Sequence, residues 1–356
     1  MLTFSGTRAY DAGKMMEFIR EREWGLVVLD EVHVVPAEMF KKVLTLAPAH
    51  CKLGLTATLV REDDKIDRLN YLIGPKLFEA NWMELSRSGF IADVECCEVL
   101  CPMTAEFFRE WVREKDSRKK HLLTTLNPTK VRTCAVLVGM HLERGDKVIV
   151  FSDNVFSLKL YASTLGCPFI YGGTSQSERM RILQTFRASP GGSCIFLSKV
   201  GDTSLDLPEA SVLIQVSGLF GSRRQEAQRL GRILRAKERR VDAGGGRGLG
   251  KDAWFYSLVS KDTEEVYYAA KRRGFLVDQG YSFKVITDIP ALRSTSCASS
   301  DLPYSTLEKQ IELLHTVLVQ SEKTLDDDEA ADVEVDEDGM GAVSKTHLTL
   351  PTTYRV

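Results

Sequence analysis

Apolar and polar residues follow two patterns along this chain. Short apolar runs rich in β-branched residues are typical of strands in a parallel sheet, and apolar residues three or four positions apart are typical of amphipathic helices. After residue 146 the two patterns alternate, with strands predicted at 147–153, 169–171, 194–198, 212–216 and 254–259 and helices at 155–165 and 177–187. This alternation predicts an α/β protein with a doubly wound parallel sheet.

The first hundred residues show a related pattern. Helices are predicted at 14–23, 36–46 and 61–72, and strands at 26–29 and 52–58. Leu26 to Leu29 form an unbroken apolar run, so we expect this strand to be buried on both faces. From 90 to 101 apolar and polar residues alternate, and this segment is predicted to lead into a second lobe.

The predicted elements group into three parts. Residues 1–90 are expected to form a partial first lobe, and 91–287 a complete second lobe with a charged, helical insertion at 102–132. The remaining part, 288–356, opens with a capping-box pattern at Ser305–Glu308 and an amphipathic helix. The apolar face predicted for this helix is Leu307, Ile311, Leu314 and Leu318. The acidic run 326–338 has the composition of a disordered segment.

The composition argues against a membrane or secreted protein. Hydrophobic residues make up 44% of the 356 positions, and no apolar run is long enough to span a bilayer, so no membrane partner is expected. The eight cysteines show no Cys-x-x-Cys spacing, which favours reduced thiols over a disulfide framework or a zinc site. The net charge of −2 hides an asymmetry, because residues 322–356 hold ten acidic and three basic residues. The rest of the chain keeps 44 basic and 39 acidic residues, a balance compatible with nucleic-acid binding.

Two carboxylates, Asp30 and Glu31, follow the strand predicted at 26–29. In open α/β sheets, ligands bind at the carboxyl ends of the strands. A carboxylate placed there can hold a magnesium ion, and a second one can polarise the water that attacks a γ-phosphate. Taken alone, the same pattern also fits an acidic turn without chemistry.

The stretches that follow carry a family resemblance. Asp-Glu-Val-His at 30–33 and Thr-Ala-Thr at 56–58 resemble motifs II and III of superfamily 2 helicases. With Arg61, Glu62 and Asp63 and the runs 53–66, 73–85 and 275–286, the first 286 residues resemble the XPB family, the translocase subunits of the factor TFIIH. The resemblance implies two RecA-like lobes. Without it, the Arg-Glu-Asp triplet also fits a helix N-terminus with acids favoured by the dipole.

Three stretches of the second half match further helicase motifs. Gly172, Gln176 and Arg179 fit the pattern G-x-x-x-Q-x-x-R, and 198–208 resembles motif V. The run 225–235 reads Gln-x-x-Gln-Arg-x-Gly-Arg-x-x-Arg, which is motif VI. On a helix its two last arginines share a face, from which two guanidiniums could reach γ-phosphate oxygens. A basic surface helix is the alternative interpretation of that run alone.

The resemblance implies a role for each matching residue. Asp30 would hold magnesium, Glu31 would act as general base, and His33 would couple the site to Gln225 or Gln228 across the cleft between the lobes. Arg232 and Arg235 would be arginine fingers, and Gly201 and Asp206 would contact the nucleotide. The DNA contacts implied are Thr3, Arg61, Glu62, Asp63, Arg118, Lys119, Lys120, Gln176, Arg179 and Thr203. The cofactors implied are ATP and magnesium, the partners double-stranded DNA and TFIIH core subunits, and the location the nucleus.

The insertion at 102–132 combines basic and aromatic residues. The basic ones are Arg109, Arg113, Lys115, Arg118, Lys119, Lys120, Lys130 and Arg132, and the aromatic ones Phe107, Phe108 and Trp111. This combination suits contact along a nucleic-acid backbone, and its position matches the thumb-like insertion of XPB proteins. The residues alone also fit a solvated, charged surface.

A Walker A loop, G-x-x-x-x-G-K-[ST], is expected before residue 26 and is absent there. Near-matches at 245–252 and 339–346 each lack a required residue and do not join a strand to a helix. We therefore expect an ATP-dependent 3′–5′ DNA helicase or double-stranded DNA translocase of transcription initiation and nucleotide excision repair, inactive as this chain alone. The alternatives are a non-catalytic module that binds DNA or TFIIH subunits, and an RNA helicase, which the Arg-Glu-Asp triplet and the insertion disfavour.

Overall fold

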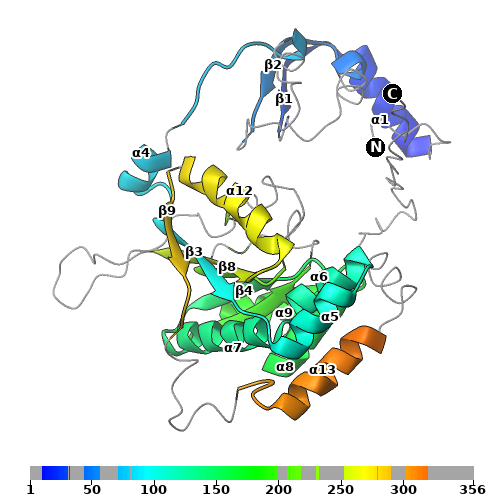
Figure 1. The fold of residues 1–356 in the computed structure, drawn as a ribbon. Helices are drawn as coiled ribbons and strands as arrows, with labels where there is room; N and C mark the ends of the chain where they lie inside the picture. Colours follow the sequence, from blue (N-terminus) through cyan, green and yellow to red (C-terminus); the bar gives the residue numbers. More distant parts are fainter. Residues whose placement is uncertain are drawn as a thin grey trace, which may run out of the picture. The chain divides into compact units, whose positions relative to one another are not determined.

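The computed structural model describes part of the chain and divides it into two compact units. The described residues are 10–30, 32, 44–56, 71–80, 82–198, 207, 209–217, 230–231, 252–278, 280–289 and 302–319. Unit 1 is Met1–Asn81 and unit 2 is Trp82–Val356 (Figure 1).

Unit 1 contains a two-stranded parallel sheet. Its elements are α1 (Tyr10–Glu21), β1 (Trp24–Leu29) and β2 (Ala49–Gly54), and Leu29 lies opposite Gly54. The strand predicted at 26–29 is confirmed, but the prediction that both its faces are buried is wrong. Leu26 is 53% and Val28 50% exposed, because β1 and β2 together form only a two-stranded sheet among the described residues.

Unit 2 is built on a seven-stranded, fully parallel sheet of order β5-β6-β4-β7-β8-β3-β9. The strands are β3 (Val94–Cys101), β4 (Lys147–Phe151), β5 (Phe169–Ile170), β6 (Ser193–Leu197), β7 (Val212–Gln215), β8 (Ala253–Ser260) and β9 (Ser282–Ile286). The predicted doubly wound parallel sheet is confirmed. Strand β3 lies in the segment 90–101, where apolar and polar residues alternate, and it is buried at six of its eight positions because β8 and β9 flank it.

Helices cover both faces of this sheet (Figure 1). The helices of unit 2 are α4 (Trp82–Arg87), α5 (Ala105–Arg113), α6 (Ser117–Thr125), α7 (Pro128–Glu143), α8 (Val155–Leu165), α9 (Gln176–Ala188), α12 (Glu264–Asp278) and α13 (Leu307–Val319). One hydrophobic cluster joins a sheet face to α5, α6, α7, α8 and α13, and another joins the opposite face to α9 and α12. Polar caps fix several helix starts: Asn127 accepts a hydrogen bond at the start of α7, Asn154 at α8 and Ser175 at α9.

The apolar face predicted for helix α13 is confirmed at Leu314 and wrong at its other three residues. Leu307, Ile311 and Leu318 are exposed, whereas Gln310, Leu313, Leu314 and Val317 are buried. The buried leucines pack with residues of α5 and α6 in the first cluster. The predicted disordered run 326–338 lies outside the described residues. Within the described part of the chain, none of the helices combines the length and apolar character needed to cross a bilayer.

Candidate functional site

In unit 1 the carboxyl ends of the two strands meet at one edge. Asp30 follows β1, and Leu55 and Thr56 follow β2. The Leu55 N–H donates to the Leu29 carbonyl at 2.8 Å, and the Val32 N–H donates to the Leu55 carbonyl at 3.1 Å. These two hydrogen bonds therefore join the segment that follows β1 to the segment that follows β2. The structure brings the exposed Asp30 carboxylate and Thr56 to the same edge, as the parallel topology predicts.

Val32 anchors the turn that contains Asp30. It is 5% exposed and packs against Leu29, Leu72 and Ile73. Gly54 makes room for this packing, because a Cβ there would lie 3.1 Å from Val32 Cγ1 and 3.2 Å from Ile73 Cδ1. The sequence analysis missed both positions. The only local signal was that Val32 is the one apolar residue in Asp-Glu-Val-His.

Replacing Gly54 with valine is therefore expected to destabilise this edge. The added atoms would push Val32 and Ile73 apart, and overpacking of this kind costs about 1–3 kcal/mol. Hydrogen–deuterium exchange of peptides that cover 24–32 should show faster exchange. Gly25→Val on the neighbouring strand is the matched control, because a Cβ at Gly25 meets nothing within 4 Å. Equal exchange in the two variants would contradict the anchoring role.

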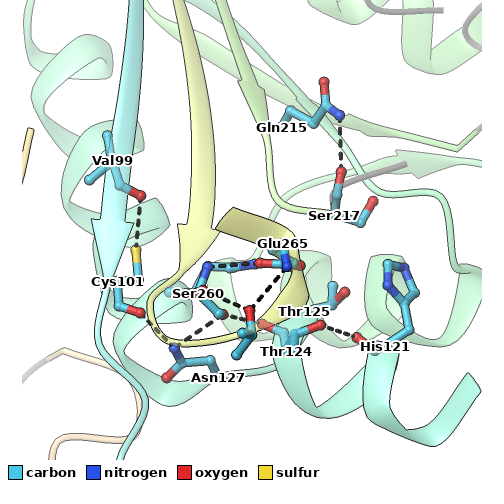
Figure 2. A network of polar contacts seen from close by, with 12 residues as sticks. Val99, Cys101, His121, Thr124, Thr125, Asn127, Gln215, Ser217, Ser260 and Glu265 are labelled. Atoms are coloured by element: carbon cyan, nitrogen blue, oxygen red, sulfur yellow. Dashed lines mark hydrogen bonds and ion pairs between the residues drawn. The ribbon is translucent and has the colours of Figure 1, made fainter. Parts of the chain in front are cut away.

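In unit 2, buried polar residues follow the strands β4, β6 and β7. Asp153 comes two residues after β4, and its N–H donates to Ser217 Oγ at 2.8 Å. The Ser217 hydroxyl donates to Asp153 Oδ2 at 3.0 Å, and Gln215 Nε2 donates to the Ser217 carbonyl at 3.0 Å. Figure 2 shows Gln215 reaching toward Ser217. Ser198, after β6, is fully buried and donates its N–H to the Ile170 carbonyl. These bonds fix the carboxyl edge of the sheet.

The predicted DNA contacts on α9 lie at this same edge. Helix α9 starts at Gln176, six residues after β5, and Ser175 Oγ accepts a hydrogen bond from the Glu178 N–H at 3.3 Å. Gln176 is exposed and Arg179 is half-buried. Three residues apart in the first turn, they share one face of the helix.

Most of the other predicted site residues lie outside the described residues. These are Thr3, Glu31, His33, Arg61, Glu62, Asp63, Gly201, Thr203, Asp206, Gln225, Gln228, Arg232 and Arg235. Of the motif VI run, Leu230 and Gly231 are described, and Leu230 is buried in the cluster on the α9 and α12 face of the sheet.

Helices α5 and α6 carry a group of cationic and aromatic residues, here called the α5–α6 surface: Phe108, Trp111, Arg118, Lys119 and Lys120. Phe108 and Arg118 are exposed, and the other three are half-buried. Phe108 stacks on Trp111 with ring centroids 5.9 Å apart, and Lys120 Nζ lies 5.1 Å from the Trp111 ring. Asp116 caps α6 by accepting from the Arg118 and Lys119 N–H groups. The predicted surface is wrong at Phe107 and Lys130, because both side chains are fully buried. Phe107 fills the core between α5 and the sheet, and Lys130 has an internal partner.

That partner is Glu265, in the first turn of α12. Lys130 Nζ donates to Glu265 Oε2 at 2.7 Å, and the two side chains are 0% and 3% exposed. The Ser260 N–H donates to the same oxygen at 2.7 Å. Burial alone would raise the pKa of Glu265, but the Lys130 ammonium and the Lys130 and Ser260 hydrogen bonds hold it below its ordinary value. The ion pair joins α7 to the first turn of α12.

Further hydrogen bonds join the α6–α7 junction to the strand ends (Figure 2). Asn127 Nδ2 donates to the Cys101 carbonyl at 3.2 Å and to Ser260 Oγ at 3.3 Å. The Ser260 hydroxyl donates to the Thr124 carbonyl at 2.7 Å. Since Cys101 ends β3 and Ser260 ends β8, this network holds the base of the α5–α6 surface on the sheet.

Asp30 fits the magnesium that the resemblance implies. The described residues contain no group of three or more His, Cys, Asp or Glu side chains able to form a metal cage. Magnesium bound together with a nucleotide needs only one or two protein carboxylates, the rest of its shell being water and phosphate oxygens. One exposed carboxylate at a strand end meets that requirement.

Comparison with known proteins identifies the family of this chain. Residues 85–345 match the family described as ERCC3/RAD25/XPB C-terminal helicase, so the chain belongs to this family. It is 57% identical over 332 residues to the "General transcription and DNA repair factor IIH helicase/translocase subunit XPB" of Schizosaccharomyces pombe, covering 93% of this chain and 40% of the relative. The relative of the same name in Dictyostelium discoideum is 54% identical over 355 residues, 100% of this chain and 43% of the relative.

The chain thus spans about two fifths of the length of these curated relatives. Among solved structures, Saccharomyces cerevisiae Dbp5 bound to RNA and ADP BeF3 aligns with 86% of this chain and 68% of its own, at 12% identity and a TM-score of 0.49. That likeness carries no argument about function.

Proposed function

We propose that this chain is the catalytic carboxyl-terminal part of an ATP-driven DNA translocase or 3′–5′ helicase, a nuclear subunit of TFIIH in transcription initiation and nucleotide excision repair. The observation that carries the proposal is membership of the XPB helicase family together with Asp30 and Thr56 at one strand edge. The names of the relatives support it, since they are helicase/translocase subunits of a transcription and DNA repair factor.

The nucleotide site is proposed on the motif residues. Asp30 holds magnesium, Glu31 orients and deprotonates the attacking water, and Gly201 and Asp206 contact the nucleotide. His33 couples with Gln225 or Gln228, and Arg232 and Arg235 stabilise charge on the transferred phosphoryl group. When bound, magnesium would neutralise part of the negative charge on the β- and γ-phosphates.

The activity test compares this chain with an extended one. The sequence contains no complete G-x-x-x-x-G-K-[ST] motif, and positioning of the phosphates supplies most of phosphoryl-transfer catalysis. We expect no DNA-stimulated ATP hydrolysis from residues 1–356, and turnover when the amino-terminal part of the S. pombe relative is fused before Met1. Glu31→Gln in the fusion should abolish it. A fusion that binds DNA without turnover would favour the non-catalytic module instead.

DNA contact is proposed along Thr3, Arg61, Glu62, Asp63, Gln176, Arg179, Thr203 and the α5–α6 surface. The arrangement of Lys120 over Trp111, with Phe108 stacked beside it, suits contact with phosphates and bases of any sequence. Because this contact is electrostatic, it should weaken as salt reduces the advantage of releasing counterions from the DNA.

Replacing Arg118, Lys119 and Lys120 with alanine is expected to lower the affinity for duplex DNA. The slope of log affinity against log salt should become shallower by up to about 0.9 for each phosphate that the variant no longer neutralises. Fluorescence anisotropy with a labelled duplex at several salt concentrations measures both. The matched control replaces Lys261, Lys271 and Lys309, which are exposed elsewhere on unit 2 and change the net charge equally. Equal slopes in both triple variants would show that the α5–α6 surface is solvated and does not bind DNA.

A further inference from the structure

Two cysteines of unit 2 lie on neighbouring chain segments, Cys167 two residues before β5 and Cys194 within β6. Strands β5 and β6 are parallel, with Phe169 opposite Phe196. Continuing that register by two residues places Cys167 opposite Cys194. The pairing extends toward them, because the Phe196 N–H donates to the Pro168 carbonyl at 2.9 Å.

The two thiols lie on the same face of the sheet. Cys167 and Cys194 pack, with Phe169 and Phe196, into the cluster that α7 and α8 cover. Neighbouring strands are about 4.8 Å apart, within the range of roughly 4.4–6.8 Å between Cα atoms that a disulfide requires. A bond between the two sulfurs therefore needs little backbone movement.

The surroundings of the two thiols differ. Cys167 is half-buried and follows Gly166, which ends α8 with a φ of +64°, whereas Cys194 is only 7% exposed. The hydrogen bond from Cys194 lowers the pKa of Cys167, and the same contact, together with burial, raises the pKa of Cys194 well above its ordinary value. The more accessible sulfur is thus the one that ionises first, and thiolates are the forms that react with peroxides.

We propose that Cys167 and Cys194 form a peroxide-sensitive dithiol site that closes reversibly to a disulfide. The Cys167 thiolate attacks one oxygen of a hydroperoxide, the O–O bond breaks, and the sulfur becomes a sulfenic acid while hydroxide or alkoxide leaves. The Cys194 sulfur then displaces the sulfenic oxygen, which departs as water with the Cys194 proton. Two thiols lose two electrons, and one peroxide gives water and a second water or an alcohol.

Closure would tie together two strands that lead to the carboxyl edge of the sheet. Strand β5 runs on to the segment with Gln176 and Arg179, and β6 runs on to Ser198. The oxidised chain should therefore unfold at a higher temperature than the reduced one, since a disulfide restricts the unfolded state.

The test uses the full chain. The protein is reduced, freed of reductant, treated with hydrogen peroxide at neutral pH, blocked with N-ethylmaleimide and digested with trypsin without reduction. Trypsin separates Cys167, in 160–179, from Cys194, in 188–199. We expect the two peptides to be joined, about 2 Da lighter than their sum, and to separate on treatment with dithiothreitol.

Variants separate the two steps. Cys194→Ala should leave Cys167 as a sulfenic acid that dimedone traps, and Cys167→Ala should leave Cys194 unoxidised. Cys51→Ser, at an exposed cysteine of β2, is the control and should still form the bond. The proposal is overturned if the wild-type chain yields the two peptides separately alkylated, or Cys167 oxidised to sulfinic acid beside an alkylated Cys194. Because this measurement needs no variant, misfolding of a variant does not affect it.

Discussion

Replacing Lys130 with methionine is expected to lower the free energy of unfolding by about 3–5 kcal/mol at neutral pH. The ammonium pairs with Glu265 where both side chains are almost inaccessible to water, and methionine would leave the carboxylate buried without its ion-pair partner. Ser260 would remain as a hydrogen-bond donor but cannot supply charge. Urea denaturation of the full chain, followed by circular dichroism, measures the loss.

The loss should depend on pH in a definite direction. In the wild type the pKa of Glu265 is held below 4.5, so its stabilising contribution is present above that value and disappears as the pH falls through the folded pKa. Without Lys130, burial should raise this pKa above 4.5, so protonation relieves the unpaired charge as the pH falls toward that range. The difference between variant and wild type should therefore be smaller at pH 5.5 than at pH 7.5.

A double variant identifies the cause. Glu265→Gln in the Lys130→Met background removes the charge and keeps an oxygen for the Ser260 N–H, so part of the stability should return and the pH dependence of the difference should vanish. If the double variant is no more stable than Lys130→Met at pH 7.5, the unpaired carboxylate is not the source of the loss.

Replacing Arg235 with alanine is expected to lower DNA-stimulated ATP turnover by about 10³-fold in the fused chain described above. The proposed finger acts on charge that develops as the γ-phosphoryl group is transferred, whereas ground-state affinity for nucleotide comes from other contacts. Nucleotide affinity should therefore change little, and kcat should carry the loss. Arg232→Ala should behave in the same way.

Two variants test this assignment. Arg235→Lys should not restore turnover, because an ammonium cannot reproduce the planar, two-pronged guanidinium. Arg20→Ala, at an exposed position of α1, removes the same charge and should leave turnover unchanged. Turnover near the parent level in both Arg235 variants would show that motif VI serves structure or DNA contact.

The sequence predicted those features that depend on neighbouring residues. Apolar, β-branched runs marked β1, β4, β6 and β7, and alternation with helices marked the parallel sheet. Asp30 could be placed at a strand end because its strand was recognisable and the topology puts such ends at one edge. The roles of Val32 and Gly54 could not be predicted in this way, because their packing depends on Ile73, which is distant in sequence.

The failures involve partners far along the chain. Lys130 looked like one more surface cation because Glu265 lies 135 residues away. Glu95 and Glu98 interrupt the apolar residues of strand β3. Glu98 is buried with Arg273 3.9 Å away, and Glu95 pairs with Lys284, so their polarity is satisfied by α12 and β9. No local window contains these contacts.

The prediction for helix α13 failed for a related reason. Its apolar residues form two overlapping faces, and the periodicity of the helix does not decide between them. Packing against α5 and α6 buries the face with Leu313 and Val317, and these two helices lie almost two hundred residues earlier in the chain.

The position of β3 in the sheet also constrains how unit 2 can form during synthesis. Among the described strands its partners are β8 and β9, which begin at Ala253 and Ser282. A ribosome that adds about 5–20 residues per second would need on the order of 10–30 s to reach Ala253 after completing Cys101. Throughout that interval β3, with its three cysteines and apolar side chains, has neither of these strands to pair with. Until β8 and β9 emerge, β3 is therefore an apolar strand with unpaired edges, the kind of segment that is prone to aggregate during folding.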